Sequence, residues 1–396
     1  MLNGPFSPWP SFTKEEADAV SRVLLSNKVN YWTGNECRQF EQEFAAFADC
    51  EYAVALSNGT LALDVALKAL GIGPGDEVVT TPRTFLASAS CIVTAGATPV
   101  FAEVDANTQN ITAESIRAVL SPNTRAVICV HLAGMPCDMD PIMQLAAEHN
   151  LFVIEDCAQA HGATYKGRSV GSIGHVGAWS FCQDKIMTTG GEGGMVTTND
   201  RALWSAMWSY KDHGKSWEAV YEREHPPGFR WLHESFGTNW RMTEIQAVLG
   251  RIQLLRMAAW TAARRANAER IWQAARQCPV LRVPPVPAWA GHAAYKCYVF
   301  VEPTRLAAGW NRDRMMAEIN ARGVPCYSGS CSEVYLEKAF DGQPSDGRTW
   351  RPERRLPVAQ ALGETSLMFL VHPTLTSAEI DRTCAVLAEV AGLAQG

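Results

Sequence analysis

The sequence predicts an α/β protein with a mostly parallel sheet, followed by a smaller α+β unit at the C-terminal end. Over the first 200 residues, short apolar segments alternate with segments of helical length. Such strand–helix–strand alternation is typical of parallel sheets that helices cover on both faces. Beyond a proline-rich stretch at 279–287, further strand-like and helix-like segments follow. With 396 residues, the chain is long enough for two or three domains.

The expected strands are short apolar runs bounded by turn residues. They cover 52–56, 77–81, 99–103, 126–130, 151–155, 177–181 and 194–198. Helices are expected between the early strands, at 61–70, 85–95, 113–120 and 139–150. The last two strands are too close for a helical crossover, so we expect one of them to run antiparallel.

The remaining organisation follows from turn residues and one helical pattern. Residues 71–76 place glycines before a strand, the reverse of a nucleotide-binding fingerprint, so they predict a helix C-cap and turn. From Thr243 an amphipathic helix is expected, with one apolar face formed by Ile245, Val248, Leu249, Ile252 and Leu255. Four prolines at 279–287 indicate a boundary or an edge connection, before a strand at 297–301 and helices at 313–322 and 377–391. We therefore expect a large domain over 1–255 and a small C-terminal domain over 256–396.

The composition excludes several classes of protein. Hydrophobic residues make up 47% and charged residues 19%, which is typical of a globular chain. The net charge of −6, without a polybasic segment, argues against a nucleic-acid partner. No apolar run is long enough for a membrane helix, and the first residues lack a signal-peptide pattern. The 12 cysteines lack metal-binding spacing, so we expect no metal and reduced thiols in a cytoplasmic protein.

The first pattern with chemical meaning is Ser57-Asn58-Gly59-Thr60, between an expected strand and helix. A helix N-terminus offers free N–H groups and a partial positive charge, which suit a phosphate. Gly59 would let the anion approach the backbone. The alternative is an ordinary helix cap.

The second and third patterns follow buried strands. Glu155 and Asp156 end the strand 151–155, where ligands bind in open α/β sheets. A buried carboxylate needs a compensating cation, supplied either by a ligand or by a structural ion pair. Lys185 follows the strand 177–181 and precedes a glycine run at 190–194. A sheltered lysine can attack a carbonyl as a neutral amine, although most lysines are simply exposed.

One ligand satisfies all three patterns. Pyridoxal 5′-phosphate (PLP) has a phosphate for the helix, a protonated ring nitrogen for the carboxylate and an aldehyde for the lysine. With these motifs in view, the chain resembles the DegT/DnrJ/StrS family of PLP-dependent sugar aminotransferases along nearly its whole length. The most specific motifs are Glu-Asp-Cys-Ala-Gln-Ala-His-Gly at 155–162, Ser-Phe-x-x-x-Lys at 180–185 and Gly-Glu-Gly-Gly at 191–194.

The resemblance implies an aspartate-aminotransferase-like fold (fold type I) with a seven-stranded sheet, forming a homodimer whose active sites lie at the interface. By match of motif, Lys185 forms the Schiff base with the cofactor. Asp156 pairs with the pyridine nitrogen, and Gln159 lies near the 3-hydroxyl of the ring. The phosphate is held by Ser180 and by the amides of Gly59 and Thr60.

Two further residues take roles from the resemblance. Phe85 matches the aromatic residue that stacks on the cofactor ring, and Asn239 matches a residue that crosses to the phosphate of the partner subunit. Each has a structural alternative. Phe85 would otherwise be ordinary core packing. Asn239 and Arg241 would otherwise cap the helix that begins near Thr243.

The function implied is transfer of an amino group, usually from L-glutamate, to a nucleotide-linked ketosugar. The acceptor is most often a 4-keto-6-deoxyhexose, and the products enter O-antigen, lipopolysaccharide or related amino-sugar biosynthesis. Related sugar dehydratases replace the Schiff-base lysine, so Lys185 favours transfer over dehydration. A non-catalytic regulator would predict loss of Lys185 or Asp156. An oxidoreductase would need a glycine fingerprint after a strand.

Two segments depart from the family pattern. Residues 215–235 form a longer segment than expected, which either shapes the acceptor site or is a surface loop; we favour the loop. Residues 326–331, Cys-Tyr-Ser-Gly-Ser-Cys, differ from the histidine-containing segment of many members, which leaves the sugar specificity open. Cys326 and Cys331 form either a redox pair or, as we favour, part of a non-catalytic loop.

Overall fold

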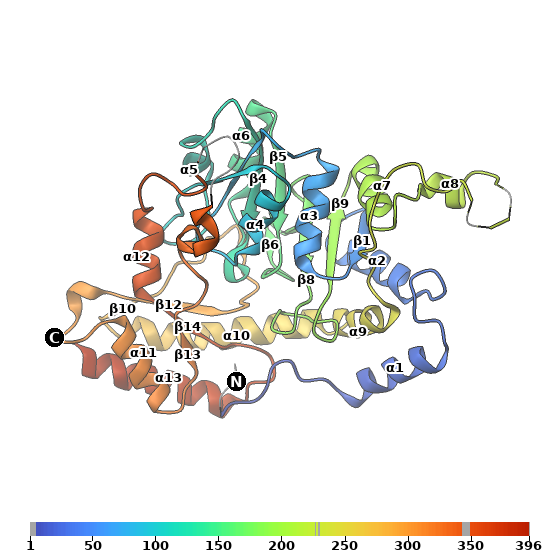
Figure 1. The fold of residues 1–396 in the computed structure, drawn as a ribbon. Helices are drawn as coiled ribbons and strands as arrows, with labels where there is room; N and C mark the ends of the chain where they lie inside the picture. The colour runs from blue at the N-terminus through green and yellow to red at the C-terminus, as the bar shows by residue number, and fades with distance from the viewer. Residues whose placement is uncertain (1–4, 226, 229, 343–348, 396) are drawn as a thin grey trace.

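A computed structural model describes residues 5–225, 227–228, 230–342 and 349–395, and Figure 1 shows its arrangement. Its largest sheet has seven strands in the order β1-β9-β8-β5-β4-β2-β3. The strands are β1 (Tyr52–Leu56), β2 (Glu77–Thr80), β3 (Thr98–Phe101), β4 (Thr124–Val130), β5 (Phe152–Asp156), β8 (Val176–Ser180) and β9 (Gly194–Thr198). Only β9 runs against its neighbours, β1 and β8, within this sheet. The predicted mixed, mostly parallel sheet is therefore confirmed, with β9 as the antiparallel strand.

The two faces of this sheet are covered by different helices. Alternate side chains of a strand point to opposite faces, so Val153 and Ile154 of β5 enter different core clusters. One face packs against α3 (Gly59–Ala69), α4 (Ala87–Thr94) and α7 (Arg201–Tyr210). The other contacts α2 (Glu36–Phe47), α5 (Ala113–Arg117), α6 (Met139–His149) and α9 (Glu244–Leu254). Both faces are thus buried, as the apolar strands predict.

A second sheet, of four antiparallel strands, forms the C-terminal part. Its order is β10 (Leu281–Arg282), β12 (Cys297–Val301), β14 (Ser366–Phe369) and β13 (Cys326–Tyr327). It shares a core with α10 (Met257–Arg276), α11 (Arg312–Ala321) and α13 (Ser377–Ala394). A further helix, α12 (Pro357–Thr365), contacts β12. Figure 1 shows α10 running beneath the large sheet towards this second core. The division into 1–255 and 256–396 remains a prediction.

The proline-rich stretch connects two sheet edges. It leads from β10, at the edge of the second sheet, to β11 (Ala290–Gly291). Strand β11 is itself an edge of a three-stranded sheet with β6 (Thr164–Tyr165) and β7 (Arg168–Ser169). Of the two interpretations of the prolines, the edge connection is confirmed, and the domain boundary remains a prediction.

The predicted helix from Thr243 is α9. The Thr243 side chain caps it, in a capping box with Gln246. Ile245, Val248 and Ile252 pack against α1 (Lys14–Leu25). Leu255 is 88% exposed because the helix ends at Leu254, so its place on the apolar face was wrong.

The turn after α3 also forms as predicted. The helix ends at Ala69, its C-cap is Leu70, and Gly71 follows with φ of +70°. Glycine adopts this left-handed conformation without a Cβ penalty. Residues 71–76 therefore begin with the helix end and turn that the sequence predicts.

The segment 215–235 lies at the surface where the structure describes it; Pro226 and Phe229 lie outside the described residues. It contains α8 (Trp217–Tyr221), which projects away from the sheets in Figure 1. Trp217 anchors it, with its ring 5.0 Å from that of Trp204 and 5.1 Å from that of Trp208. Within the described ranges, no helix has the length and apolar character needed to cross a membrane.

Candidate functional site

The start of α3 lies against the end of β8. A Cβ atom placed on Gly59 would lie 2.4 Å from the Ser180 Cβ, so only glycine permits this approach. The Asn58 side chain accepts a 3.0 Å hydrogen bond from the amide of Leu61 and so caps the helix. The cap leaves the first-turn amides of Gly59 and Thr60 available for an anion. The cap and the phosphate site are therefore compatible, and Ser180 adds a hydroxyl beside them.

Asp156 is a buried carboxylate at the end of β5. It is 5% exposed and accepts hydrogen bonds from the Ser88 hydroxyl at 2.7 Å and the Ala158 amide at 3.1 Å. Burial raises the pKa of Asp156, and these donors and the charge of Lys185 offset the rise only in part. Among the described residues, no cation lies within ion-pair distance of it. A protonated ring nitrogen would supply the missing partner, and that partner would lower the pKa.

Glu155, by contrast, is a structural residue. One carboxylate oxygen accepts from the amides of Ile173 and Gly174, at 2.8 and 2.7 Å. The other accepts from the Gly171 amide at 2.8 Å and lies 3.0 Å from Nε2 of His131. Burial acts to raise the pKa of Glu155, but these contacts outweigh it and the pKa is lowered. Glu155 therefore has a structural role, held by hydrogen bonds from backbone amides and His131, whereas Asp156 lacks such a set of partners in the described part of the chain.

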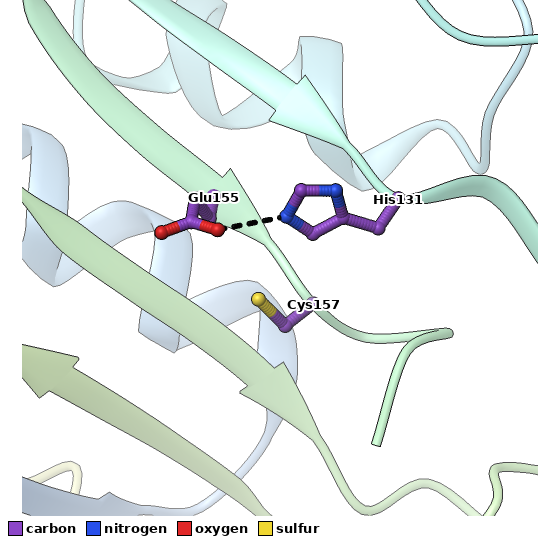
Figure 2. A group of neighbouring side chains, drawn as sticks. All are labelled: His131, Glu155 and Cys157. Atoms are coloured by element: carbon purple, nitrogen blue, oxygen red, sulfur yellow. Dashed lines mark hydrogen bonds and ion pairs between the residues drawn. The ribbon is translucent and has the colours of Figure 1, made fainter. Parts of the chain in front are cut away.

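Figure 2 shows His131, Glu155 and Cys157, whose possible ligand atoms lie within 4.8 Å of one another. Hydrogen bonds account for this cluster without an ion. His131 Nδ1 accepts from the Cys137 amide at 3.0 Å, which places the ring proton on Nε2, facing Glu155. Burial raises the pKa of the Cys157 thiol well above its usual value, so it stays protonated. The cluster fixes the ends of β4 and β5.

Lys185 is sheltered. Its side chain is 15% exposed, and its Nζ lies 3.9 Å from Asp184 Oδ1 and 5.4 Å from the centre of the Tyr295 ring. Its carbonyl accepts a 2.8 Å hydrogen bond from the Trp9 indole, which fixes the backbone at this point. The alternative of an ordinary surface lysine is therefore wrong.

A cavity of about 530 Å³ brings Lys185, Gln159 and Phe85 together. Phe85 is 68% exposed, which overturns the core-packing alternative and leaves an aromatic face free for a ligand ring. The Gln159 oxygen accepts from the Ala133 amide at 2.9 Å, so its NH₂ group is left to donate. Asp156 and Ser180 do not line this cavity. Asp156 connects to it through Ser88 and Thr84, whose hydroxyl oxygens are 2.9 Å apart.

Asn239 lies apart from this cavity, exposed in the loop before α9. The helix-cap alternative is wrong, because Thr243 caps α9 and Arg241 instead pairs with Asp212 at 2.6 Å. The role of Asn239 toward a partner subunit remains a prediction.

Cys326 and Cys331 are free thiols. Cys326 is buried in β13, where burial raises its pKa to about 12, so a redox role does not suit it. Cys331 is exposed and lines the cavity, and its carbonyl accepts from the Thr84 amide at 3.1 Å. The favoured loop interpretation fits, although this loop also forms a wall of the site.

Three contributors to the site carry no sequence signal: Ser88, Trp9 and Tyr295. Ser88 contacts a residue 68 positions away, and Trp9 one 176 positions away. Tyr295 donates to Asp184 from 111 positions away. Only the fold reveals such long-range contacts.

The chain's own groups fit PLP. They comprise helix amides and a hydroxyl for a phosphate, an unpaired carboxylate, a sheltered amine and an exposed aromatic face. Comparison with known proteins agrees with this fit. The DegT/DnrJ/EryC1/StrS aminotransferase family matches residues 10–388.

Individual relatives cover nearly the whole chain. GDP-perosamine synthase of Caulobacter vibrioides is 37% identical, over 96% of this chain and 96% of the relative. The spore coat polysaccharide biosynthesis protein SpsC of Bacillus subtilis is 42% identical, over 94% and 93%. The crystal structure of an aminotransferase from Psychrobacter cryohalolentis is 68% identical, with a TM-score of 0.96 over 98% of this chain and 100% of that one. The expected aminotransferase fold is confirmed.

Proposed function

This chain belongs to the DegT/DnrJ/EryC1/StrS aminotransferase family and is a PLP-dependent aminotransferase, and on this premise we propose its substrates. The amino donor is L-glutamate, and the acceptor is a nucleotide-linked ketosugar, most specifically a 4-keto-6-deoxyhexose. The observation that carries the proposal is the sheltered amine of Lys185 in one cavity with Phe85 and Gln159. The relatives named GDP-perosamine synthase and SpsC support a sugar acceptor and a polysaccharide product.

Each residue of the site has a physical task. PLP, when bound, supplies an electron sink for the carbanion formed at the Cα of the amino donor. Asp156 holds the proton on the ring nitrogen, and the Lys185 amine moves the proton between donor and cofactor as base and then acid. Phe85 fixes the plane of the ring by stacking. Ser180 and the amides of Gly59 and Thr60 are proposed to bind the phosphate, and Gln159 is proposed to contact the 3-hydroxyl group of the ring.

The two rival functions make different demands on these residues. A sugar dehydratase of this kind replaces the Schiff-base lysine, and a non-catalytic regulator has no need to keep both Lys185 and Asp156. Both residues are present, and Asp156 is buried without an ion-pair partner among the described residues. Holding such a carboxylate costs stability, which favours a catalytic use.

We further propose a homodimer with shared sites, in which Asn239 contacts the phosphate bound by the partner subunit. Its exposed position outside the cavity of its own chain supports this role. The test is to co-express Lys185→Ala and Asn239→Ala chains with different tags. If sites are shared, the mixed dimer contains one intact site and recovers about half of the wild-type activity per dimer. Activity no higher than that of the Asn239→Ala homodimer would refute shared sites.

The cofactor attachment is tested by borohydride reduction of the purified holoenzyme and peptide mapping by mass spectrometry. A phosphopyridoxyl group on Lys185 is expected. L-Glutamate is then tested with UDP-, GDP- and dTDP-linked ketosugars, with amino-sugar formation as the readout. Formation of a dehydrated sugar in place of an amino sugar would overturn the proposal. We also propose that the enzyme acts in the cytoplasm, at a step before polysaccharide assembly.

A further inference from the structure

A second cavity adjoins the one that contains the Lys185 amine. Its volume is about 300 Å³, and Asp184, Tyr295 and Lys296 line both cavities. The second cavity is also lined by Arg264 of α10 and by His372. It is therefore a side pocket of the proposed active site, with basic groups in its wall.

Arg264 is the feature that requires a ligand. Its side chain is buried, with a residue exposure of 1%, and its Nη1 makes a long 3.4 Å hydrogen bond to the Tyr295 carbonyl. Its Nε and Nη2 have no hydrogen-bond partner in the described part of the chain. The Trp9 ring lies 4.8 Å from the guanidinium carbon and covers its face. Buried guanidinium groups are normally paired, so these two nitrogens mark a missing acceptor.

The two unpartnered nitrogens have a specific geometry. Nε and Nη2 form one edge of the guanidinium, the edge that binds both oxygens of a carboxylate side by side. Leu370, Val371 and Met368 give the pocket an apolar part as well. A planar carboxylate on a short carbon chain suits this lining better than a highly hydrated diphosphate.

The charges around the pocket add to this argument. Burial lowers the pKa of Lys296 to about 8 and that of Arg264 to about 9, as expected for cations that lack full compensation. Asp184 is the carboxylate in the wall, and it already accepts the Tyr295 hydroxyl. Burial lowers the pKa of His372 to about 3, so it is neutral, and its Nε2 has no hydrogen-bond partner among the described residues. The wall of this pocket therefore contains the cations Arg264 and Lys296 and the carboxylate of Asp184, which already accepts a hydrogen bond.

We infer that this side pocket binds a carboxylate of the amino donor, with Arg264 as its bidentate partner and Lys296 beside it. The inference rests on the proposed function, since it assumes an amino-acid donor whose amine reaches Lys185. Because Asp184, Tyr295 and Lys296 line both cavities, a donor whose amine reaches Lys185 in one cavity would extend its carboxylate toward Arg264 in the other. Arg264 and Lys296 thus act as donor-recognition residues.

The test uses the PLP-loaded enzyme and two readouts. The first is calorimetric binding of glutarate, a dicarboxylate that cannot react. We expect Arg264→Met to weaken glutarate binding about 30-fold or more, as for loss of one partner of a buried charge pair. Lys296→Met weakens it less, and Arg264→Lys restores part of it. The matched control is Arg276→Met on the same helix, where an exposed arginine pairs with Glu269, and it leaves binding unchanged.

The second readout is the half-reaction with L-glutamate, followed by cofactor absorbance in single turnovers. Arg264→Met is expected to raise the glutamate concentration for half-maximal rate about 30-fold, with a smaller change in the limiting rate. The rate with a carboxylate-free primary amine is expected to stay the same. A general folding defect would lower both rates.

The outcomes separate this inference from the proposed function. Wild-type glutarate affinity in both Arg264→Met and Lys296→Met would overturn the pocket assignment. Pyrophosphate binding is measured in the same way. If Arg264→Met and Lys296→Met lose pyrophosphate binding but keep glutarate binding, the pocket binds another anion and the donor assignment is also overturned. If the wild-type enzyme fails to react with L-glutamate, the proposed donor is wrong, and glutarate binding still decides the pocket. If Arg264→Met does not fold, Lys296→Met and Arg264→Lys decide.

Discussion

The hydroxyl of Ser88 donates a 2.7 Å hydrogen bond to Oδ2 of Asp156. The oxygen of Thr84, which lines the cavity, lies 2.9 Å from that of Ser88. Hydrogen bonds to a carboxylate stabilise its ionised form, so Ser88 opposes the effect of burial on the pKa of Asp156. Ser88 is therefore a positioning residue for Asp156, the acid proposed to pair with the cofactor ring nitrogen.

Replacing Ser88 tests this relationship. Ser88→Ala is expected to raise the pKa of Asp156 and to lower the glutamate half-reaction rate about 10-fold, since a hydrogen bond to a charged group contributes about 1.5–3 kcal/mol. The acidic limb of the pH–rate profile should move to higher pH. Ser88→Thr keeps the hydroxyl and should restore the profile. Ser90→Ala, on the same helix, is the control. An unchanged profile in Ser88→Ala would contradict the role.

Lys185→Ala is expected to abolish amino transfer while PLP still binds without a covalent bond, because the phosphate site and Asp156 remain. The measurements are cofactor absorbance after gel filtration and peptide mapping after borohydride reduction. Lys166→Ala, at an exposed lysine paired with Asp140, should keep both the adduct and the activity. Turnover near the wild-type rate in Lys185→Ala would remove Lys185 from the mechanism.

Asp156→Asn is expected to slow proton removal from the donor about 100- to 1,000-fold, the usual effect of losing one electrostatic contact in an active site. PLP affinity should fall much less, because the proposed phosphate site is formed by other residues, Gly59, Thr60 and Ser180. The rate of proton removal is measured with Cα-deuterated glutamate, whose primary isotope effect identifies that step. PLP affinity is measured separately as the PLP dissociation constant. Equal losses in both would show that Asp156 serves binding alone.

Phe85→Ala should separate stacking from stability. The side chain is 68% exposed, so the apo protein should lose no more than about 0.5 kcal/mol of unfolding free energy. PLP affinity should fall about 3- to 10-fold, because an aromatic stacking pair contributes about 0.5–1.5 kcal/mol. Phe85→Tyr should retain it. Thermal melts without PLP and PLP titrations provide the two measurements, and a destabilised apo protein would restore the core-packing interpretation.

Glu155→Gln is expected to destabilise the fold by about 3 kcal/mol or more, because an amide cannot accept from every donor around the carboxylate. The pKa of Glu155 is lowered in the folded state, so its stabilisation is complete above the unfolded pKa of about 4.3. It is lost as pH falls through the folded pKa. The melting-temperature gap between wild type and variant should therefore be constant near neutral pH and narrow below about pH 4. A gap that widens in acid would contradict this assignment.

The sequence predicted those parts of the fold and site that depend on local pattern. The strand positions could be predicted because a short apolar run between turn residues is recognisable without knowledge of its partner strands. Lys185 could be identified because of the motifs that flank it. The residue pattern alone did not distinguish Glu155 from Asp156, and only the family resemblance assigned the ring nitrogen to Asp156. In the structure, the amides of the 171–174 loop separate their roles. The error at Leu255 arose because periodicity does not show where a helix ends.

The position of β9 also affects how the protein forms during synthesis. β1 is an edge strand whose one neighbour in the large sheet is β9, made about 140 residues later. A Cβ on Gly194 would lie 2.2 Å from the Asn58 carbonyl oxygen, so the end of β9 closes tightly on the start of α3. A nascent chain that stops before residue 194 therefore lacks the strand that joins β1 to β8 and holds Gly59 and Thr60 beside Ser180. The enzyme should acquire affinity for its cofactor late in translation, only after β9 has left the ribosome.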